Sequence, residues 1–142
     1  MRERFFIDTW GWVALGHKKD SHHKEIIRFY REAQSRRDEV ITSDYVLDEL
    51  ITLLFRRENS EEALAFIEGI LASAAQGYIK IEKISLGQFE IAWNLRKQLK
   101  KMPLISFTDL TSMLLMQEMG IKKILTEDRH FFQMGMGFQK VP

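Results

Sequence analysis

The apolar residues of this chain switch several times between a two-residue period and a helical period. This alternation predicts strands and helices that follow one another along a largely parallel sheet, which is an α/β fold. We expect strands at residues 4–8, 40–43, 78–84 and 124–126, and an edge strand near 138–141. Helical patterns occupy residues 22–37 and 44–55, the segment capped by Asn59, the segment from Phe89 to Leu99, and residues 106–119.

The length and composition of the chain limit what it can be. Its 142 residues, 45% of them hydrophobic, are enough for one ordinary domain, so we expect a single globular unit over residues 1–142. We find no pattern of a signal peptide or a membrane span. The absence of cysteine excludes disulfides and thiolate metal sites, which fits the cytoplasm. Because 21 basic residues nearly balance 20 acidic ones, a nucleic-acid partner requires charges that are segregated in space.

Three acidic residues fall at positions where parallel strands end. In the stretch FFIDTWGWVAL, Asp8 directly follows three large apolar residues, Asp109 lies in the first turn of a predicted helix, and Asp128 follows a predicted strand. A carboxylate at the edge of a hydrophobic core is costly unless a cation compensates for its lost hydration. The carboxyl ends of parallel strands, and the helix starts beyond them, converge on one crevice. We therefore expect a divalent cation site.

Each of these acids also has a purely structural explanation. Asp8 could cap the helix that follows it, Asp109 could favour the positive end of its own helix, and Asp128 could belong to a surface turn. Three acids together at sheet-end positions favour a metal site over three separate explanations.

Three segments of the chain resemble the PIN-domain ribonucleases, and most closely the VapC-type toxins of prokaryotic toxin–antitoxin pairs. They are FIDTWGWVAL, ITSDYVLDEL and LISFTDLTSMLLMQEMGIKKILTEDRHF. The last is the most specific, because it is similar to the family's S-x-x-D helix and T-x-D-x-x-F turn. The resemblance covers nearly the whole chain. It implies a PIN-like three-layer α/β/α sandwich with a mostly parallel central sheet of about five strands.

The resemblance also implies the residues of the site. The family's catalytic, metal-binding acids fall on Asp8, Glu49, Asp109 and Asp128. Periodicity alone does not choose between Glu49 and Asp48, which border the apolar stripe of their helix on opposite sides. The implied cofactor is Mg²⁺ or Mn²⁺, since both ions prefer hard oxygen ligands.

Other polar residues lie close to these acids in the sequence. Hydroxyl groups could orient the carboxylates from nearby positions. Ordinary helix capping explains the hydroxyl of Ser106 equally well. The hydroxyl candidates are Thr9, Ser106 and Thr126. Basic residues near the proposed site could contact a substrate, although most such charges are solvated helix ends. The basic candidates are Arg56, Arg57 and Arg129.

The implied function is a metal-dependent endoribonuclease that cuts single-stranded or loop RNA and serves as the toxin of a type II toxin–antitoxin pair. The expected partners are RNA, a small antitoxin and a second copy of the chain. One alternative is a haloacid-dehalogenase-like phosphatase, but that family expects a second aspartate where this chain has Trp10. The other is a non-catalytic PIN-fold module that binds RNA or protein, which would be expected to lack one or more of the four acids.

Overall fold

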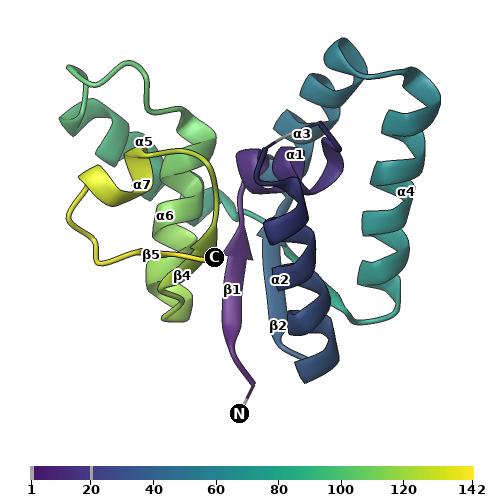
Figure 1. Ribbon diagram of the computed structural model, residues 1–142. Coiled ribbons are helices and arrows are strands. Elements are labelled where there is room, and N and C mark those ends of the chain that lie inside the picture. Colours follow the sequence, from purple (N-terminus) through teal and green to yellow (C-terminus); the bar gives the residue numbers. More distant parts are fainter. Residues whose placement is uncertain (1, 20) are drawn as a thin grey trace.

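The computed structural model describes residues 2–19 and 21–142 (Figure 1). Within these residues, five strands form one parallel sheet in the order β3-β2-β1-β4-β5. The strands are β1 (Arg4–Ile7), β2 (Glu39–Ser43), β3 (Ile79–Glu82), β4 (Lys123–Leu125) and β5 (Gln139–Lys140). The predicted α/β class and the mostly parallel sheet are confirmed.

Seven helices in the described ranges connect the strands and cover the sheet. They are α1 (Thr9–Gly16), α2 (His23–Arg36), α3 (Asp44–Arg57), α4 (Ser60–Ala75), α5 (Leu86–Gln98), α6 (Phe107–Met119) and α7 (His130–Gln133). Figure 1 shows α1 to α4 on one side of β1 and α5 to α7 on the other side. None of the helices in this part of the chain is long and apolar enough to cross a membrane.

Both faces of the sheet are covered. Phe5, Phe6 and Ile7 follow one another in β1, and successive side chains of a strand point to opposite faces. Each of the three is at most 1% exposed, so β1 lies between two layers of helices. On one face, the Phe5 ring packs edge-on against Phe29 of α2, with ring centroids 5.2 Å apart. This is the three-layer α/β/α arrangement.

The order of the strands places the carboxyl ends of β1 and β4 side by side. β1 pairs with β2 on one side and with β4 on the other, and Ile7 lies opposite Leu125. The chain builds β2 and β3 outward before it crosses back to β4, so the connection changes direction between β1 and β4. Open α/β sheets bind ligands in the crevice at such a point. Asp8 and Thr126 are the first residues beyond these two strand ends.

The sequence patterns set no bounds for two short helices. They indicated only that Asp8 could cap a helix after it and that residues 126–131 resemble the family's T-x-D-x-x-F turn. α1 buries residues on several of its faces, so it has no polar face that would reveal a helical period. α7 has four residues, which is barely more than one turn.

Several apolar side chains that the helical patterns singled out are exposed. In α4, Ile67 and Ile70 are buried, whereas Leu64 and Leu71 are 56% and 46% exposed. The same holds for α5, which packs on α6 and buries Ala92, while other apolar side chains of α5 face outward. A helical period therefore predicted the helices correctly but not which apolar positions the chain itself covers.

Candidate metal centre

Asp8 directly follows β1 and caps α1. Its Oδ1 accepts a hydrogen bond from the backbone N–H of Gly11 at 2.8 Å, and its Oδ2 accepts one from the hydroxyl of Thr126 at 2.6 Å. Thr126 Oγ1 in turn accepts a hydrogen bond from the backbone N–H of Asp128 at 2.9 Å. The residue Asp8 is only 1% exposed. One threonine hydroxyl therefore connects the first acid to the turn that carries the last one.

Gly11 lets α1 lie directly against β4. A Cβ atom at residue 11 would lie 2.1 Å from the carbonyl oxygen of Leu125 and 3.0 Å from a methyl carbon of Ile7. A backbone carbonyl cannot move aside as the end of a flexible side chain can, so this position requires glycine. Sequence reasoning did not single out Gly11. The available signal was a glycine in the first turn of a helix that a buried aspartate caps.

We expect Gly11→Ala to destabilise the protein and to displace Asp8 from Thr126. Overpacking at a rigid position typically costs about 1–3 kcal/mol, and here the obstacle is backbone. Thermal unfolding should therefore show a lower Tm for this variant than for Gly69→Ala, whose added Cβ would meet nothing within 4 Å. Equal melting temperatures for Gly11→Ala and the wild type would contradict the close approach of α1 to β4.

Asp109 lies in the first turn of α6 and shares a capping box with Ser106. Ser106 Oγ accepts a hydrogen bond from the backbone N–H of Asp109 at 3.0 Å, and Asp109 Oδ2 accepts one from the backbone N–H of Ser106 at 3.2 Å. Asp109 is 5% exposed, and within the described ranges its Oδ1 accepts no hydrogen bond. For Asp8 and Asp109, capping and a place in the site are therefore not alternatives, because the cap also fixes the carboxylate.

Asp128 lies in the turn that leads into α7, beside His130. Asp128 Oδ1 accepts a hydrogen bond from the backbone N–H of His130 at 2.9 Å and lies 2.8 Å from the ring Nδ1 of the same residue. That ring nitrogen is buried and has no aligned hydrogen-bond partner among the described residues. One ligand atom from each of Asp109, Asp128 and His130 lies within 4.8 Å of the others. The sequence placed His130 beside Asp128 but did not indicate it as a metal ligand, because a histidine in a surface turn has the same local signature.

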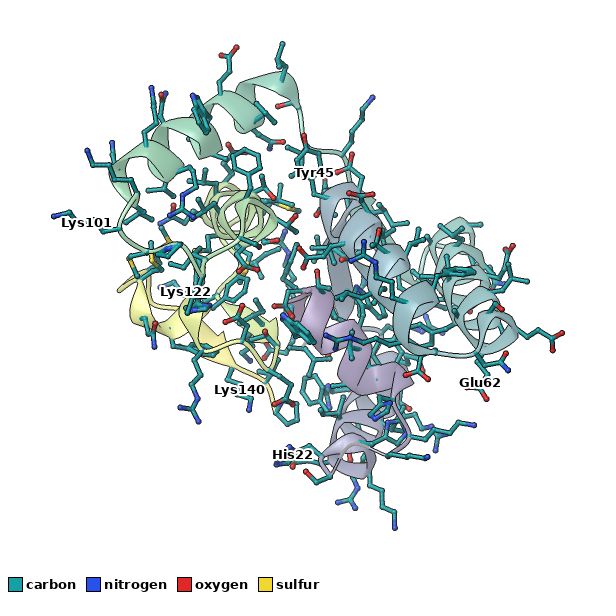
Figure 2. The ribbon with its side chains drawn as sticks, turned by 90° about the horizontal axis from the view of Figure 1, so that it is seen from above. His22, Tyr45, Glu62, Lys101, Lys122 and Lys140 are labelled. Atoms are coloured by element: carbon teal, nitrogen blue, oxygen red, sulfur yellow. The ribbon has the colours of Figure 1, made fainter. Side chains whose placement is uncertain are left out.

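Glu49 and Asp48, which periodicity left undecided, lie in different surroundings. Glu49 is partly buried, and its negative charge acts on Asp109. Asp48 is exposed. Figure 2, which looks from above, shows α6 along its axis, with α1 and α3 across from it. The elements that carry Asp8, Glu49 and Asp109 thus meet at this end of the molecule.

Burial and mutual repulsion perturb the acids. Burial raises the pKa of Asp8 well above its usual value of 3.8, and the charges of Asp109 and Asp128 add to this effect. The hydrogen bonds from Thr126 and Gly11 oppose it. Burial, followed by the charge of Asp128, raises the pKa of Asp109 to about 7. Without a compensating cation the group therefore keeps part of its protons at neutral pH, and a bound divalent ion would favour full ionisation.

The remaining candidates from the sequence lie at different depths. Thr9 is buried, and its hydroxyl has no hydrogen-bond partner in the part of the chain that the structure describes. The basic candidates Arg56, Arg57 and Arg129 are exposed. Arg57 lies over the ring of Trp10. A hollow of about 880 Å³ beside Arg2, Arg37 and Tyr78 is at the opposite end of the sheet and contains none of the four acids.

The donor set fits a hard divalent cation. Asp8, Glu49, Asp109 and Asp128 offer carboxylate oxygens, which Mg²⁺ and Mn²⁺ prefer over nitrogen or sulfur. Three buried polar atoms have no aligned hydrogen-bond partner among the described residues: Thr9 Oγ1, Ser112 Oγ and His130 Nδ1. Thr9 follows Asp8 directly, and His130 Nδ1 lies 2.8 Å from Asp128 Oδ1. Such atoms are expected in a site that a hydrated cation completes.

Comparison with known proteins identifies the family. The model of the PIN domain family matches residues 5–135, and the chain belongs to this family. It is 31% identical over 132 residues to the 23S rRNA-specific endonuclease VapC20 of Mycobacterium tuberculosis, a match that covers 92% of this chain and 93% of the relative. The chain is therefore a homologue of a VapC-type endonuclease, and the predicted resemblance is confirmed. Membership of the PIN family also removes the haloacid-dehalogenase-like alternative.

Solved structures show the same fold. The crystal structure of Mycobacterium tuberculosis VapC20, described as a sarcin-ricin loop cleaving toxin, matches with a TM-score of 0.79 at 30% identity and covers 96% of this chain and 98% of its own. VapBC2 from Rickettsia felis, bound to a promoter DNA fragment, matches with a TM-score of 0.70 over 98% of this chain and 99% of its own. The second match, at 15% identity, shows the fold alone. The predicted PIN-like sandwich is confirmed.

Proposed function

We propose that this chain is a divalent-metal-dependent endoribonuclease and the toxin of a type II toxin–antitoxin pair. The observation that carries the proposal is the group of Asp109, Asp128 and His130, whose ligand atoms lie within 4.8 Å of one another. The charges of Asp109 and Asp128 act on Asp8, and the charge of Glu49 acts on Asp109, which supports a place for all four acids in one site. The relationship to a 23S rRNA-specific endonuclease supports RNA as the substrate. The presence of all four acids disfavours a non-catalytic PIN-fold module.

We assign to Asp8, Glu49, Asp109 and Asp128 the task of holding Mg²⁺ or Mn²⁺. When bound, such an ion lowers the pKa of a water molecule and neutralises charge on the phosphate oxygens. Thr126 fixes one oxygen of Asp8 through its hydroxyl, so this carboxylate is oriented before RNA arrives. Ser106 does the same for Asp109 through its backbone N–H.

The residues around the acids complete the proposed mechanism. His130, whose backbone and ring both approach Asp128, holds that carboxylate in place. Arg56 and Arg129 are exposed and adjoin the elements that carry the acids, so we propose that they contact RNA phosphates. Because Asp109 has a pKa of about 7, a proton leaves this group when a cation binds at neutral pH. No side chain needs to form a covalent intermediate with RNA.

The experiment for this function is cleavage of RNA by the purified protein. Intact ribosomes and free RNA are incubated with Mg²⁺ or Mn²⁺, with EDTA as the control, and the cleaved ends are sequenced. We expect metal-dependent cuts at few positions, with 23S rRNA as the first substrate to examine because of the relative. Absence of metal-dependent cleavage on all of these RNAs would favour a binding module instead.

We further propose that a small antitoxin holds the enzyme inactive by placing a basic side chain among the acids. The four carboxylates repel one another, and an arginine can pair with two carboxylate oxygens at once. The native complex should therefore copurify from its host and dissociate at high salt. Purification of the chain from its host without any small partner would count against this proposal.

We also propose that residues 1–142 form a single domain that acts in the cytoplasm. The sheet extends from Arg4 to Lys140, and the family model spans residues 5–135, which supports one unit. Figure 2 shows Lys101, Lys122 and Lys140 on the α5 to α7 side, far from Glu62 of α4.

We propose a homodimer that forms through α5. Leu86, Phe89 and Trp93 are 73%, 39% and 51% exposed, and their spacing of three and four residues places them on one stripe of the helix. Contiguous apolar surface of this kind typically marks an interaction site. The methionines Met113 and Met116 of α6 are fully buried and belong to the core, so they do not contribute to this surface.

Light scattering tests the dimer. The double variant Leu86→Glu, Trp93→Glu should be monomeric at concentrations where the wild type is dimeric, because charges replace the apolar centre of the stripe. Leu64→Glu is the matched control, since Leu64 is 56% exposed on α4 and lies outside the stripe. A wild type that is monomeric at all concentrations, or a double variant that stays dimeric, would contradict this interface.

A further inference from the structure

Trp10 and Arg57 form a cation–π pair beside the candidate metal centre. The guanidinium carbon Cζ of Arg57 lies 5.3 Å from the centroid of the Trp10 ring. Trp10 lies in the first turn of α1, two residues after Asp8, and Arg57 is the last residue of α3. Glu49 precedes Arg57 by a little over two turns of α3, which is about 12 Å along the helix axis. The pair therefore connects α1, which follows Asp8, with α3, which carries Glu49.

The guanidinium of Arg57 has no acidic partner in the part of the chain that the structure describes. Arg57 forms no salt bridge within residues 2–19 and 21–142, and the neighbouring Glu58 pairs with His17 instead, with Oε1 and Nδ1 3.2 Å apart. The guanidinium lies over the ring of Trp10, which is itself half-buried. Arg57 as a whole is exposed to solvent. The cation thus has an aromatic neighbour and no acidic partner among the described residues.

We infer that Arg57, held by Trp10, is a stacking platform for an unpaired nucleobase next to the scissile phosphate. This inference rests on the proposed ribonuclease function and adds the part of the substrate that is recognised. Unpaired bases of loops and single strands stack on aromatic rings and on guanidinium planes. A base on the side of Arg57 away from the indole would complete a sandwich of base, guanidinium and indole. Arg57 then binds and positions the RNA, while the acids carry the chemistry.

An exposed arginine can instead bind a phosphate, and the structure distinguishes the two roles. A guanidinium that lies over an indole can offer its other face to a planar ligand, and it is weakly hydrated, which favours stacking. Arg56 is the neighbouring residue, is also exposed, and has no aromatic contact among the described residues. Arg56 is therefore the residue suited to a phosphate and serves as the matched control for Arg57.

The test compares the affinities for two RNA hairpins that differ only in the loop. One loop has randomised nucleotides, and the other has abasic nucleotides, which keep every phosphate and remove every base. Fluorescence anisotropy measures binding with Ca²⁺ in place of Mn²⁺, since Ca²⁺ also takes carboxylate ligands. We expect the wild type to prefer the loop with bases by about tenfold, which is the size expected for one stacked base.

The variants separate stacking from charge. Arg57→Ala and Arg57→Lys should both lose most of the preference for bases, because lysine keeps the charge but lacks the plane. Trp10→Ala should weaken the preference, and Arg56→Ala should keep it. Equal loss of affinity for both hairpins in Arg57→Ala, with recovery in Arg57→Lys, would show a phosphate contact and overturn the inference. A wild type that binds both hairpins equally, or neither, would also overturn it.

Cleavage and melting distinguish this inference from the proposed function and from a packing role. If wild type prefers bases through Arg57 but cuts no RNA with Mn²⁺, the ribonuclease proposal fails and the stacking platform stands. If wild type and Arg57→Lys cut RNA with the same KM and kcat, the platform fails and the ribonuclease stands. A lower Tm of the Arg57 variants with an unchanged preference for bases would show that the pair only packs α1 on α3.

Discussion

Asp8→Asn is expected to lose most RNA cleavage while the chain keeps its fold. The amide oxygen can still accept the hydrogen bond of the Gly11 N–H, so the cap of α1 survives, but the amide cannot supply the negative charge that holds a cation. We expect the rate to fall at least about a hundredfold, which is typical of removing one strong electrostatic contributor. The rate at saturating Mg²⁺ and the far-UV circular dichroism spectrum give the comparison with wild type.

Adjacent residues of α3 supply the control for this prediction. Glu49→Gln should also lose cleavage, because the charge of Glu49 acts on Asp109. Asp48→Asn removes the same charge from the neighbouring exposed position and should cut RNA at nearly the wild-type rate. A wild-type rate for Asp8→Asn at saturating Mg²⁺, or equal losses for the two α3 variants, would show that the proposed site is wrong.

Asp109→Asn is expected to stabilise the metal-free protein. The pKa of Asp109 is raised from 3.8 to about 7, so in this pH range the folded state holds a proton that the unfolded state has released. The contribution of this proton to the free energy of unfolding is fully present below pH 3.8, and it is lost as the pH rises through about 7. An asparagine at this position does not titrate, so its stability is not lost with rising pH in this way. Its amide oxygen can still accept the hydrogen bond from the Ser106 N–H. At neutral pH we expect a gain on the order of 1 kcal/mol, as when a destabilising active-site group is removed.

Thermal melts in EDTA from about pH 4 to about pH 8 measure this effect. The difference in Tm between Asp109→Asn and the wild type should grow with pH. Mn²⁺ should raise the Tm of the wild type as a ligand that only the folded state binds, and should raise that of Asp109→Asn less. In EDTA, the gain in stability should be smaller for Asp8→Asn than for Asp109→Asn, because Asp8 also accepts a hydrogen bond from the Thr126 hydroxyl. If Asp109→Asn is less stable than wild type in EDTA at neutral pH, and Mn²⁺ shifts both equally, Asp109 serves only as a cap.

Local patterns predicted the elements whose burial is periodic. In α3, Val46, Leu50 and Leu54 are buried at helical spacing, and the helix is found where the sequence placed it. α1 escaped this reasoning because it is buried on several faces and therefore lacks a period. The apolar stripe of α5 was predicted as helix, but a period cannot say whether the chain itself or another molecule covers the stripe.

The candidate site was predictable only where the residue type and the strand end coincide. Asp8 and Thr126 follow paired strands, so a parallel sheet alone brings them together. Gly11 is required by the carbonyl of Leu125, which is distant in sequence and leaves no local pattern. Glu49 is partly buried and Asp48 is exposed. This difference in burial also depends on a contact between segments distant in sequence, the packing of α3 against α6.

Titration calorimetry with Mn²⁺ tests most directly whether these acids form one cation site. We predict saturable binding by the wild type at neutral pH, with proton release because the pKa of Asp109 is about 7. Binding should be more than about tenfold weaker in Asp8→Asn and in Asp109→Asn, a loss that even residues supporting a metal ligand can cause. Asp48→Asn should bind as the wild type does. No saturable binding by the wild type, or wild-type affinity in both aspartate variants of the site, would contradict the account.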